Sequence, residues 1–290
     1  MKLLVTGSMG FIATNFIDKY EEKYEIKELD LYEISIHGYS GILDGIDFVV
    51  NFGAQTFVDH SIKDPKEFVD RNILGTFELL EQTRKYPIKK FIHISTDEVY
   101  GSVLDGYADE KSMLNPGNPY SATKASCDMM CLAYHNTYGT PIIILRPENN
   151  YGKCQDRRKL IPKTIECAIK GINIPVYGDG KHHRMWLHVD DFCEAVDLSI
   201  EHGSIGSIYN VGGKDERENI YIVNKILEIM RKPKYLIEYI PDTKARPGHD
   251  RRYAINTDKI ELLGFKPKHN IDKSLGDVVE WYLKNQWMFK

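Results

Sequence analysis

KLLVTGSMGFIA, residues 2–13, decides the fold of this chain. Residues 2–6 form the short apolar run of a buried strand, and residues 11–20 have the apolar spacing of a helix. Between them, Gly7 permits a tight turn and Gly10 allows a ligand to approach the backbone closely. The amides of Phe11 and Ile12, in the first helical turn, are then available to a pyrophosphate. The stretch predicts a strand–turn–helix unit that binds a dinucleotide.

An acidic residue follows at the distance that such a unit requires. Asp30 ends the next predicted strand, residues 24–29, about 20 residues beyond the glycine turn. A carboxylate at this position accepts hydrogen bonds from the adenosine ribose hydroxyls and repels a 2′-phosphate, so NAD is predicted rather than NADP. The alternative is a surface aspartate that merely ends the strand.

Apolar runs and helical spacing alternate through the first half of the chain. Strands are predicted at residues 47–52, 90–95 and 141–145, and helices at 65–83 and 119–138. Strands that read as continuous apolar runs imply a parallel sheet covered by helices on both faces. We therefore predict an α/β fold with a doubly wound parallel sheet, whose ligands bind at the carboxyl ends of the strands. Only 16 residues, 31–46, separate the second strand from the third, so the sheet is expected to be trimmed there, with an open or differently built adenine pocket.

The pattern loosens after residue 149. Helices are predicted at 160–170, 189–200, 219–231 and 274–283, and strands at 174–177 and 207–211. Residues 1–148 with about 186–213 are assigned to a Rossmann domain that binds NAD. Residues of about 149–185 with 214–290 are assigned to a smaller α/β lobe that binds the substrate.

Composition excludes several classes of protein. The net charge of -4 argues against a nucleic-acid or membrane binder, and no apolar run reaches the length of a membrane span. The five cysteines are an odd number without framework spacing, which indicates a reduced, cytoplasmic location. His182, His183 and His188 lie close together, but no carboxylate or cysteine completes a ligand spacing in the sequence, so no metal is expected.

Two adjacent carboxyl groups follow a predicted buried strand in ISTDEVYG, residues 94–101. They are either a solvated polar turn or a paired acid and base. Asp97 and Glu98 would lie at the carboxyl end of the strand, where ligands bind, and this location favours the second interpretation. Two adjacent acids in a closed site push their pKa values apart, so that one is protonated and the other ionised.

A second pair of reactive groups occurs in YSATK, residues 120–124. Tyr120 and Lys124 are four residues apart and share one face of the predicted helix. The nearby ammonium and the positive ring of the cofactor are expected to lower the pKa of Tyr120 and make it a usable base.

Seven segments together carry a family resemblance: TGSMGFIA, ISTDEVYG, NPYSATK, ENNYG, PVYGDGKHHRMWLHVDD, YNVGG and RPGHDRRYAI. They occur in the order found in extended short-chain dehydrogenases, and the set closely resembles the dTDP-glucose 4,6-dehydratases along nearly the full chain. The pair Asp97-Glu98 is the most discriminating part, because related sugar-nucleotide epimerases usually lack it.

The resemblance implies a role for each reactive residue. Tyr120 would deprotonate the 4-hydroxyl while hydride leaves carbon 4 for NAD, with Thr96 and Lys124 assisting. Glu98 would then remove the proton of carbon 5 and Asp97 would protonate the departing 6-hydroxyl, before hydride returns to carbon 6. The implied enzyme is a hydro-lyase that converts a nucleoside-diphosphate glucose, first of all dTDP-glucose, to the 4-keto-6-deoxy sugar.

The resemblance also implies the residues that bind the nucleotide sugar. The diphosphate would be held by Asn150, Lys159, Leu160, Arg184 and Arg246, the base by Pro175 and Tyr177, and the sugar by Thr56. A guanidinium suits a diphosphate because it forks onto two oxygens, whereas the alternative is a solvated surface arginine.

The chain departs from the family pattern at positions that concern specificity. Residues 55–60 read QTFVDH where ESHVDR is common, Met185 replaces an acidic residue, Glu148 replaces a small one, and Arg158 stands where glutamate is usual. The catalytic residues match the family, so these differences bear on the sugar and the base that are bound.

Two other functions stay open at this point. One is a UDP-sugar dehydratase or a UDP-sugar 4-epimerase of the same fold, and an epimerase needs only Tyr120 and NAD. The other is a non-catalytic NAD-binding regulator, against which the intact Thr96, Tyr120 and Lys124 argue. The resemblance further implies a homodimer formed through the helices that begin near Pro65 and Pro119.

Overall fold

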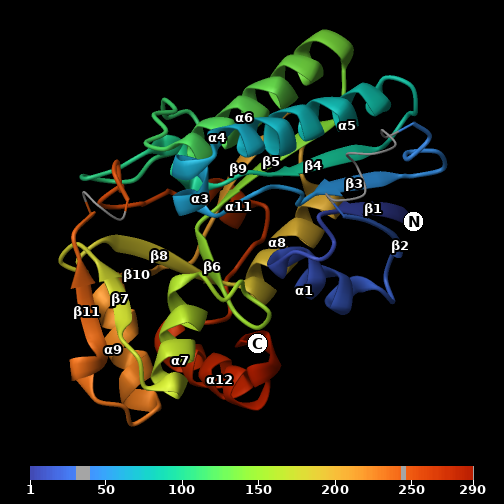
Figure 1. Cartoon of the computed structure of the whole chain (residues 1–290). Helices are drawn as coiled ribbons and strands as arrows, with labels where there is room; N and C mark the ends of the chain where they lie inside the picture. The colour runs from blue at the N-terminus through green and yellow to red at the C-terminus, as the bar shows by residue number, and fades with distance from the viewer. Residues whose placement is uncertain (31–39, 243–245, 290) are drawn as a thin grey trace.

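A computed structural model describes residues 1–30, 40–242 and 246–289 (Figure 1). Its largest element is a six-stranded sheet in the order β2-β1-β3-β4-β5-β9, in which every neighbouring pair is parallel. The strands are β1 (Lys2–Thr6), β2 (Glu25–Leu29), β3 (Phe48–Asn51), β4 (Lys90–Ile94), β5 (Ile142–Pro147) and β9 (Ile208–Val211). The order reverses beside β1, as in a doubly wound fold, so the predicted fold class is confirmed.

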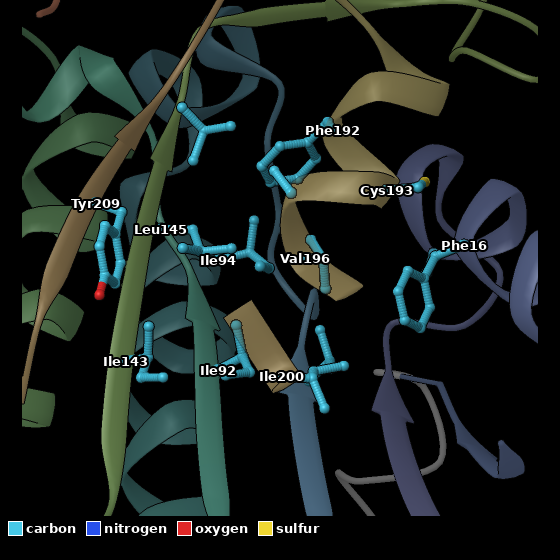
Figure 2. Close-up of a cluster of buried hydrophobic side chains, with 14 of the residues drawn as sticks. Phe16, Ile92, Ile94, Ile143, Leu145, Phe192, Cys193, Val196, Ile200 and Tyr209 are labelled. Carbon is cyan, nitrogen blue, oxygen red and sulfur yellow. The ribbon is translucent and has the colours of Figure 1, made fainter. Parts of the chain in front are cut away.

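Helices cover both faces of this sheet. On one face lie α1 (Phe11–Tyr20) and α8 (Val189–His202), and on the other lie α5 (Gly75–Thr83) and α6 (Pro119–Tyr138) (Figure 1). Figure 2 shows Phe16 of α1 and Phe192 of α8 in the first of these layers, with the side chains of β4 and β5 beside α8.

The strand sequence explains how both layers form. Successive side chains of a strand point to opposite faces of a sheet. In β5, Ile143 and Leu145 belong to the core under α8, whereas Ile144 between them belongs to the core under α5 and α6. A strand that is apolar at every position therefore stabilises two cores at once.

The second half of the chain builds two smaller sheets in the lower part of Figure 1. One has the order β10-β8-β6, formed by Asp215–Glu218, His183–His188 and Asn149–Tyr151. The other pairs β11 (Ile237–Ile240) with β7 (Ile174–Tyr177). Around them pack α7 (Leu160–Lys170), α9 (Asn219–Ile229) and α12 (Ile271–Lys284). Of these strands the sequence pattern predicted only β7, because the others are short and carry many polar residues.

Other differences from the predicted elements are local. The helix expected at 65–83 consists of α4 (Pro65–Phe68), a π-helical segment η1 (Val69–Leu74) and α5. Most of the short segment 31–46 lies outside the described residues, and its described part, 40–46, is made of turns. Short elements not predicted are α3 (Val58–Lys63), η2 (Asp97–Tyr100), η3 (Lys234–Leu236), α11 (Asp258–Leu262) and η4 (Gln286–Phe289). Among the described residues, no helix has both the length and the apolar character needed to cross a membrane.

Candidate active site

A cavity of about 510 Å³ lies at the carboxyl edge of the large sheet. At one end is the turn after β1, where Gly7 has a φ of +63° and a Cβ would lie 2.8 Å from Gly53 Cα. Gly10 donates its N–H to the carbonyl of Gly7 over 2.9 Å, which closes the turn at the start of α1. The backbone conformation therefore requires glycine at position 7, as the fingerprint predicted, and a Cβ on Gly10 would lie only 2.9 Å from the carbonyl oxygen of Gly7.

All the residues predicted to bind the cofactor or to act in catalysis line this one cavity. They are Gly7, Gly10, Phe11, Ile12, Asp30, Thr96, Asp97, Glu98, Tyr120 and Lys124. Asp30 lies beside the glycine turn, where its Oδ2 accepts the N–H of Met9 over 3.3 Å. The tertiary structure thus brings together residues that are up to 117 positions apart in sequence, from Gly7 to Lys124.

Asp97 is a buried acid with a defined orientation. Thr96 caps η2, where its hydroxyl accepts the N–H of Glu98 and donates to Asp97 Oδ1, both over 3.3 Å. Burial and the neighbouring Glu98 raise the pKa of Asp97 to about 8. Because Oδ1 accepts the threonine hydrogen bond, the proton resides on Oδ2, which is buried and has no partner among the described residues. Asp97 thus carries a proton at neutral pH, and it lines the first cavity.

Glu98 occupies a different position from its neighbour. It is only partly buried, and it lines both the first cavity and a second cavity of about 420 Å³. Its Oε2 accepts a hydrogen bond from the hydroxyl of Tyr253 over 3.2 Å. The two adjacent carboxyl groups therefore have unequal environments, which is the arrangement an acid–base pair needs.

Tyr120 is held at the start of α6. Asn118 caps this helix in a capping box with Ser121, and the N–H of Tyr120 donates to Ser61 Oγ over 3.2 Å. The prediction that Lys124 lowers the pKa of Tyr120 is not met by the groups of the chain. Burial and then Glu98 raise that pKa, and the ammonium of Lys124 donates to the carbonyl of Ile94 over 2.6 Å. A low pKa at Tyr120 therefore depends on a positive charge brought by a ligand.

The second cavity is basic and adjoins the first. Of the residues predicted to bind the nucleotide sugar, it is lined by Asn150, Lys159, Leu160, Pro175, Tyr177, Arg184 and Arg246. The remaining one, Thr56, lines the first cavity instead. Its carbonyl accepts the ammonium of Lys159 over 2.9 Å, so Thr56 lies where the two cavities meet.

Carboxylates and histidine orient the arginines of this cavity. Arg246 Nε donates to Asp59 Oδ1 over 2.6 Å, and the same carboxylate accepts the hydroxyl of Tyr177. Arg184 Nη2 lies 3.1 Å from His249 Nε2, and burial lowers the pKa of this histidine to about 2, so the ring is neutral and Nε2 accepts. Arg184 Nη1 and Nη2 also donate to the carbonyls of His183, Arg251 and Asp250, so only its Nε–H has no partner among the described residues. Arg246 uses only Nε in this way, so its two terminal nitrogens keep donors for an anionic ligand.

Several residues of the two cavities escaped prediction. They are Asp59, Glu148, Asn149, Gln155, Asn219, His249, Asp250 and Tyr253. For His249, Asp250 and Tyr253 a signal was present, since all three belong to the motif RPGHDRRYAI. Glu148 was noted only as an unusual residue of its segment.

The sequence showed no carboxylate at ligand spacing from His182 or His188, but the folded chain places carboxylates beside both. The fold supplies carboxylates from distant segments, so that His182 joins Asp242 and His249, and His188 joins Asp190 and His269. In each cluster the two rings are stacked, with centroids 3.8 Å and 4.1 Å apart. His249 Nδ1 is bonded to Asp242, and His269 Nδ1 is bonded to Asp191. These bonds and the ring stacking explain why the side chains of each cluster lie together.

The first cavity is also rich in unsatisfied polar atoms. Six of its buried atoms have no hydrogen-bond partner among the described residues: Ser95 Oγ, Asp97 Oδ2, Glu148 Oε1, Asn149 Oδ1, Asn150 Oδ1 and Gln155 Oε1. Buried polar atoms are nearly always paired, so a concentration of this kind marks the place where a polar ligand binds. With the glycine turn at one end, the cavity fits a dinucleotide.

The fold and the paired cavities define an extended short-chain dehydrogenase that acts on a nucleotide sugar. A model of the family described as GDP-mannose 4,6 dehydratase matches residues 17–278. The chain is 42% identical to a dTDP-glucose 4,6-dehydratase of Xanthomonas campestris pv. campestris, over 98% of this chain and 93% of the relative. The chain belongs to this family of nucleotide-sugar 4,6-dehydratases, as the resemblance predicted.

Solved structures agree with this assignment. The dTDP-glucose 4,6-dehydratase DesIV of Streptomyces venezuelae, crystallised with NAD and a second ligand, superposes with a TM-score of 0.93 at 34% identity. The match covers 99% of this chain and 98% of that one. A UDP-glucuronic acid 4-epimerase of Bacillus cereus shares the fold with a TM-score of 0.90 at 26% identity, over 98% of this chain and 100% of that one.

Proposed function

We propose that this protein is an NAD-dependent nucleotide-sugar 4,6-dehydratase, with dTDP-glucose as the first substrate to test. The observation that carries the proposal is the position of the two adjacent acids. Asp97 is protonated and faces the first cavity, whereas Glu98 lines both cavities. Elimination of water needs one carboxyl group that gives a proton to the leaving hydroxyl and a second one that takes a proton from carbon 5.

The first cavity is assigned to NAD. Its pyrophosphate would rest on the amides that follow Gly7 and Gly10, and its ribose would bond Asp30. When bound, NAD supplies the hydride acceptor at carbon 4 of the sugar and the hydride donor at carbon 6.

The residues around Thr96 carry the protons of the reaction. Tyr120 removes the proton of the 4-hydroxyl, and Glu98 removes that of carbon 5, which the 4-ketone has made acidic. Asp97 protonates the departing 6-hydroxyl, and Glu98 then returns its proton to carbon 5. Each turnover leaves Tyr120 with one proton more and Asp97 with one proton fewer. The hydroxyl of Thr96 bonds both side chains and lies on the path by which this proton returns.

The second cavity is assigned to the nucleoside diphosphate. Arg246 is held by Asp59 and keeps both terminal nitrogens as donors, whereas Arg184 is held by His249 and three carbonyls and keeps its Nε–H. Lys159 adds an ammonium whose pKa is lowered by burial. Tyr177, which also lines this cavity, offers a ring to the base. Glu98 and Lys159 line both cavities, which would put the sugar between the diphosphate and the dinucleotide.

The test is the product formed from a panel of dTDP-, UDP-, GDP- and CDP-sugars. We expect a product that has lost one water and carries a 4-keto group, without net reduction of NAD. A product of unchanged mass identifies an epimerase instead. The 4-epimerase of Bacillus cereus has the same fold as this chain. No turnover of any sugar, with NAD bound, identifies a non-catalytic regulator.

A homodimer is proposed on the basis of the helices opposite the α1–α8 face. Large apolar side chains are exposed along them: Val69, Leu74, Phe77, Met129 and Tyr138. An exposed apolar patch of this kind is typical of an interaction surface. Light scattering should give twice the 33.4 kDa of one chain, and Phe77→Glu should give the monomer. A wild-type monomer at working concentration would refute the proposal.

Two further assignments complete the proposal. A cytoplasmic location is supported by the five cysteines, all of which are free thiols. Residues 1–148 with about 186–213 are proposed as the NAD-binding part, supported by the sheet that contains β1–β5 and β9. Residues of about 149–185 with 214–290 are proposed as the substrate lobe, supported by the two smaller sheets.

A further inference from the structure

Glu148 is a third carboxyl group in the first cavity, and the mechanism above does not use it. It follows β5 directly and is only 3% exposed. Its Oε2 accepts the N–H of Gly213 over 2.8 Å, whereas its Oε1 is buried with no partner among the described residues. A Cβ on Gly212 would lie 2.2 Å from Glu148 Cδ, so the glycine pair after β9 makes room for this side chain.

The surroundings of Glu148 keep it neutral. The charged groups that act most strongly on it are Asp97 of η2 and Asp215 and Glu216 of β10, and all three are carboxyl groups. Burial and the charge of Asp97 hold the pKa of Glu148 well above its usual range. Because Oε2 accepts from the backbone amide, the proton is on Oε1. Glu148 therefore carries a buried O–H donor that has no acceptor among the described residues, and a buried donor needs one.

The position of Glu148 indicates which ligand would accept its hydrogen bond. It lines the first cavity but not the second. The glycine turn would hold the pyrophosphate at one end of this cavity, so the end with Asp97, Tyr120 and Lys124 would hold the nicotinamide half. The hydrogen-bond acceptor that a nicotinamide ring carries is the oxygen of its carboxamide.

We propose that Glu148 is a neutral carboxylic acid that donates a hydrogen bond from Oε1 to the carboxamide oxygen of the bound nicotinamide. The inference rests on the proposed function as regards the cofactor. It makes Glu148 a cofactor-binding residue, and it gives a role to one of the positions at which this chain departs from its family.

Two substitutions test the protonation state. Glu148→Gln mimics a neutral acid, because its amide accepts from Gly213 at one atom and donates from the other. Glu148→Ala removes the donor. The dissociation constant of NAD, measured by calorimetry at pH 7, should change less than about threefold in E148Q and rise about tenfold in E148A, the range of a single lost hydrogen bond. Glu280→Gln, on an exposed face of α12, is the matched control.

The pH dependence isolates the carboxyl group. As the pH rises through the raised pKa of Glu148, the donor is lost and wild type should bind NAD more weakly, whereas E148Q lacks this titration. The ratio of the two dissociation constants should therefore grow with pH. Groups whose titration does not depend on the charge of Glu148 are common to the two proteins and cancel in this ratio. Melting temperatures of all variants check the fold, and the E148Q comparison does not depend on the folding of E148A.

Three results overturn the inference. Equal losses of NAD affinity in E148Q and E148A show an ionised carboxylate. Unchanged NAD affinity in E148A shows that no bond to the cofactor exists, even if the KM of the sugar changes. A pH-independent ratio shows that the carboxyl is not the donor. Because NAD binding needs no turnover, these outcomes are distinct from a failure of the dehydratase assay.

Discussion

The hydroxyl of Tyr253 lies 3.2 Å from Glu98 Oε2 and 2.9 Å from Asp250 Oδ2. The guanidinium of Arg184 stacks over the ring of the same tyrosine, with its Cζ 4.1 Å from the ring centroid. One buried side chain therefore contacts both the proposed base for carbon 5 and an arginine of the basic cavity. A tyrosine in this place orients the Glu98 carboxylate through this hydrogen bond.

Tyr253→Phe should remove the orientation of Glu98 and keep the stacked ring. We expect kcat to fall roughly tenfold to a hundredfold, the worth of a hydrogen bond to a charged group, with little change in KM. Reduced nicotinamide should accumulate on the enzyme, because oxidation at carbon 4 precedes the affected step. Steady-state kinetics with absorbance of the reduced cofactor measure both effects. An increase in KM alone would show that Tyr253 serves only Arg184.

Glu98→Gln should separate the oxidation from the elimination. The substitution keeps the size of the side chain but removes the base for carbon 5, so dehydration should slow by roughly 10² to 10⁴. Tyr120 is intact, so enzyme-bound reduced nicotinamide should build up. Tyr120→Phe is the matched control and should give neither reduced cofactor nor product. Turnover of E98Q at the wild-type rate would mean that the two carboxyl groups are a solvated turn.

The pH dependence of turnover should report Asp97. Its acid form is the active one, and burial together with Glu98 raises its pKa to about 8. The acid is present below this value and is lost as the pH rises through it, so kcat/KM should decline above about pH 8. A rate profile measured between pH 6 and 10 checks this, with NAD saturating at every point. A profile that stays level to pH 10 would exclude Asp97 as the proton donor.

Asp30→Ala should change the choice of cofactor. The substitution removes an acceptor for the ribose hydroxyls and a charge that repels a 2′-phosphate. We expect NAD affinity to fall about tenfold or more and the advantage over NADP to narrow. Binding titrations with both cofactors measure the ratio. An unchanged ratio would reject Asp30 as the selecting residue.

Asp128→Ala should destabilise the fold beneath the site. Its carboxylate accepts from Arg146 Nε over 2.8 Å, and the two side chains are 0% and 1% exposed. Arg146 also donates to the hydroxyl of Tyr100 in η2, the element that carries the two acids. Removing Asp128 leaves a buried charge without its partner, which costs about 3–5 kcal/mol of unfolding free energy. Denaturant titration measures the loss.

An exposed ion pair provides the control for that prediction. Glu280 and Lys284 pair over 2.5 Å on α12, and both are well exposed. Glu280→Ala should lower the unfolding free energy far less than Asp128→Ala does, because exposed pairs contribute little. Equal costs for the two substitutions would contradict the role given to burial.

The sequence by itself determined the large sheet and most of the site residues. Continuous apolar runs such as 142–145 need cover on both faces, and only a parallel sheet between two helical layers supplies it. The turn after the first strand could be predicted because it needs a positive φ at Gly7, a conformation that residues other than glycine avoid. The pair Asp97-Glu98 could be recognised as a candidate site because carboxyl groups are seldom buried without a partner.

Only the tertiary structure decided how those residues act. The raised pKa of Asp97 comes from burial and then from the neighbouring Glu98, and a pattern of adjacent acids does not encode the burial. Tyr253 reaches Glu98 from 155 positions away, and the Asp242 carboxylate reaches His182 from a segment with no spacing signal. The pKa of a buried group is set by every charge that the fold brings near it. Helical and strand periods are local and survive in the sequence, whereas the electrostatic environment is a sum over distant segments and exists only once the chain has folded.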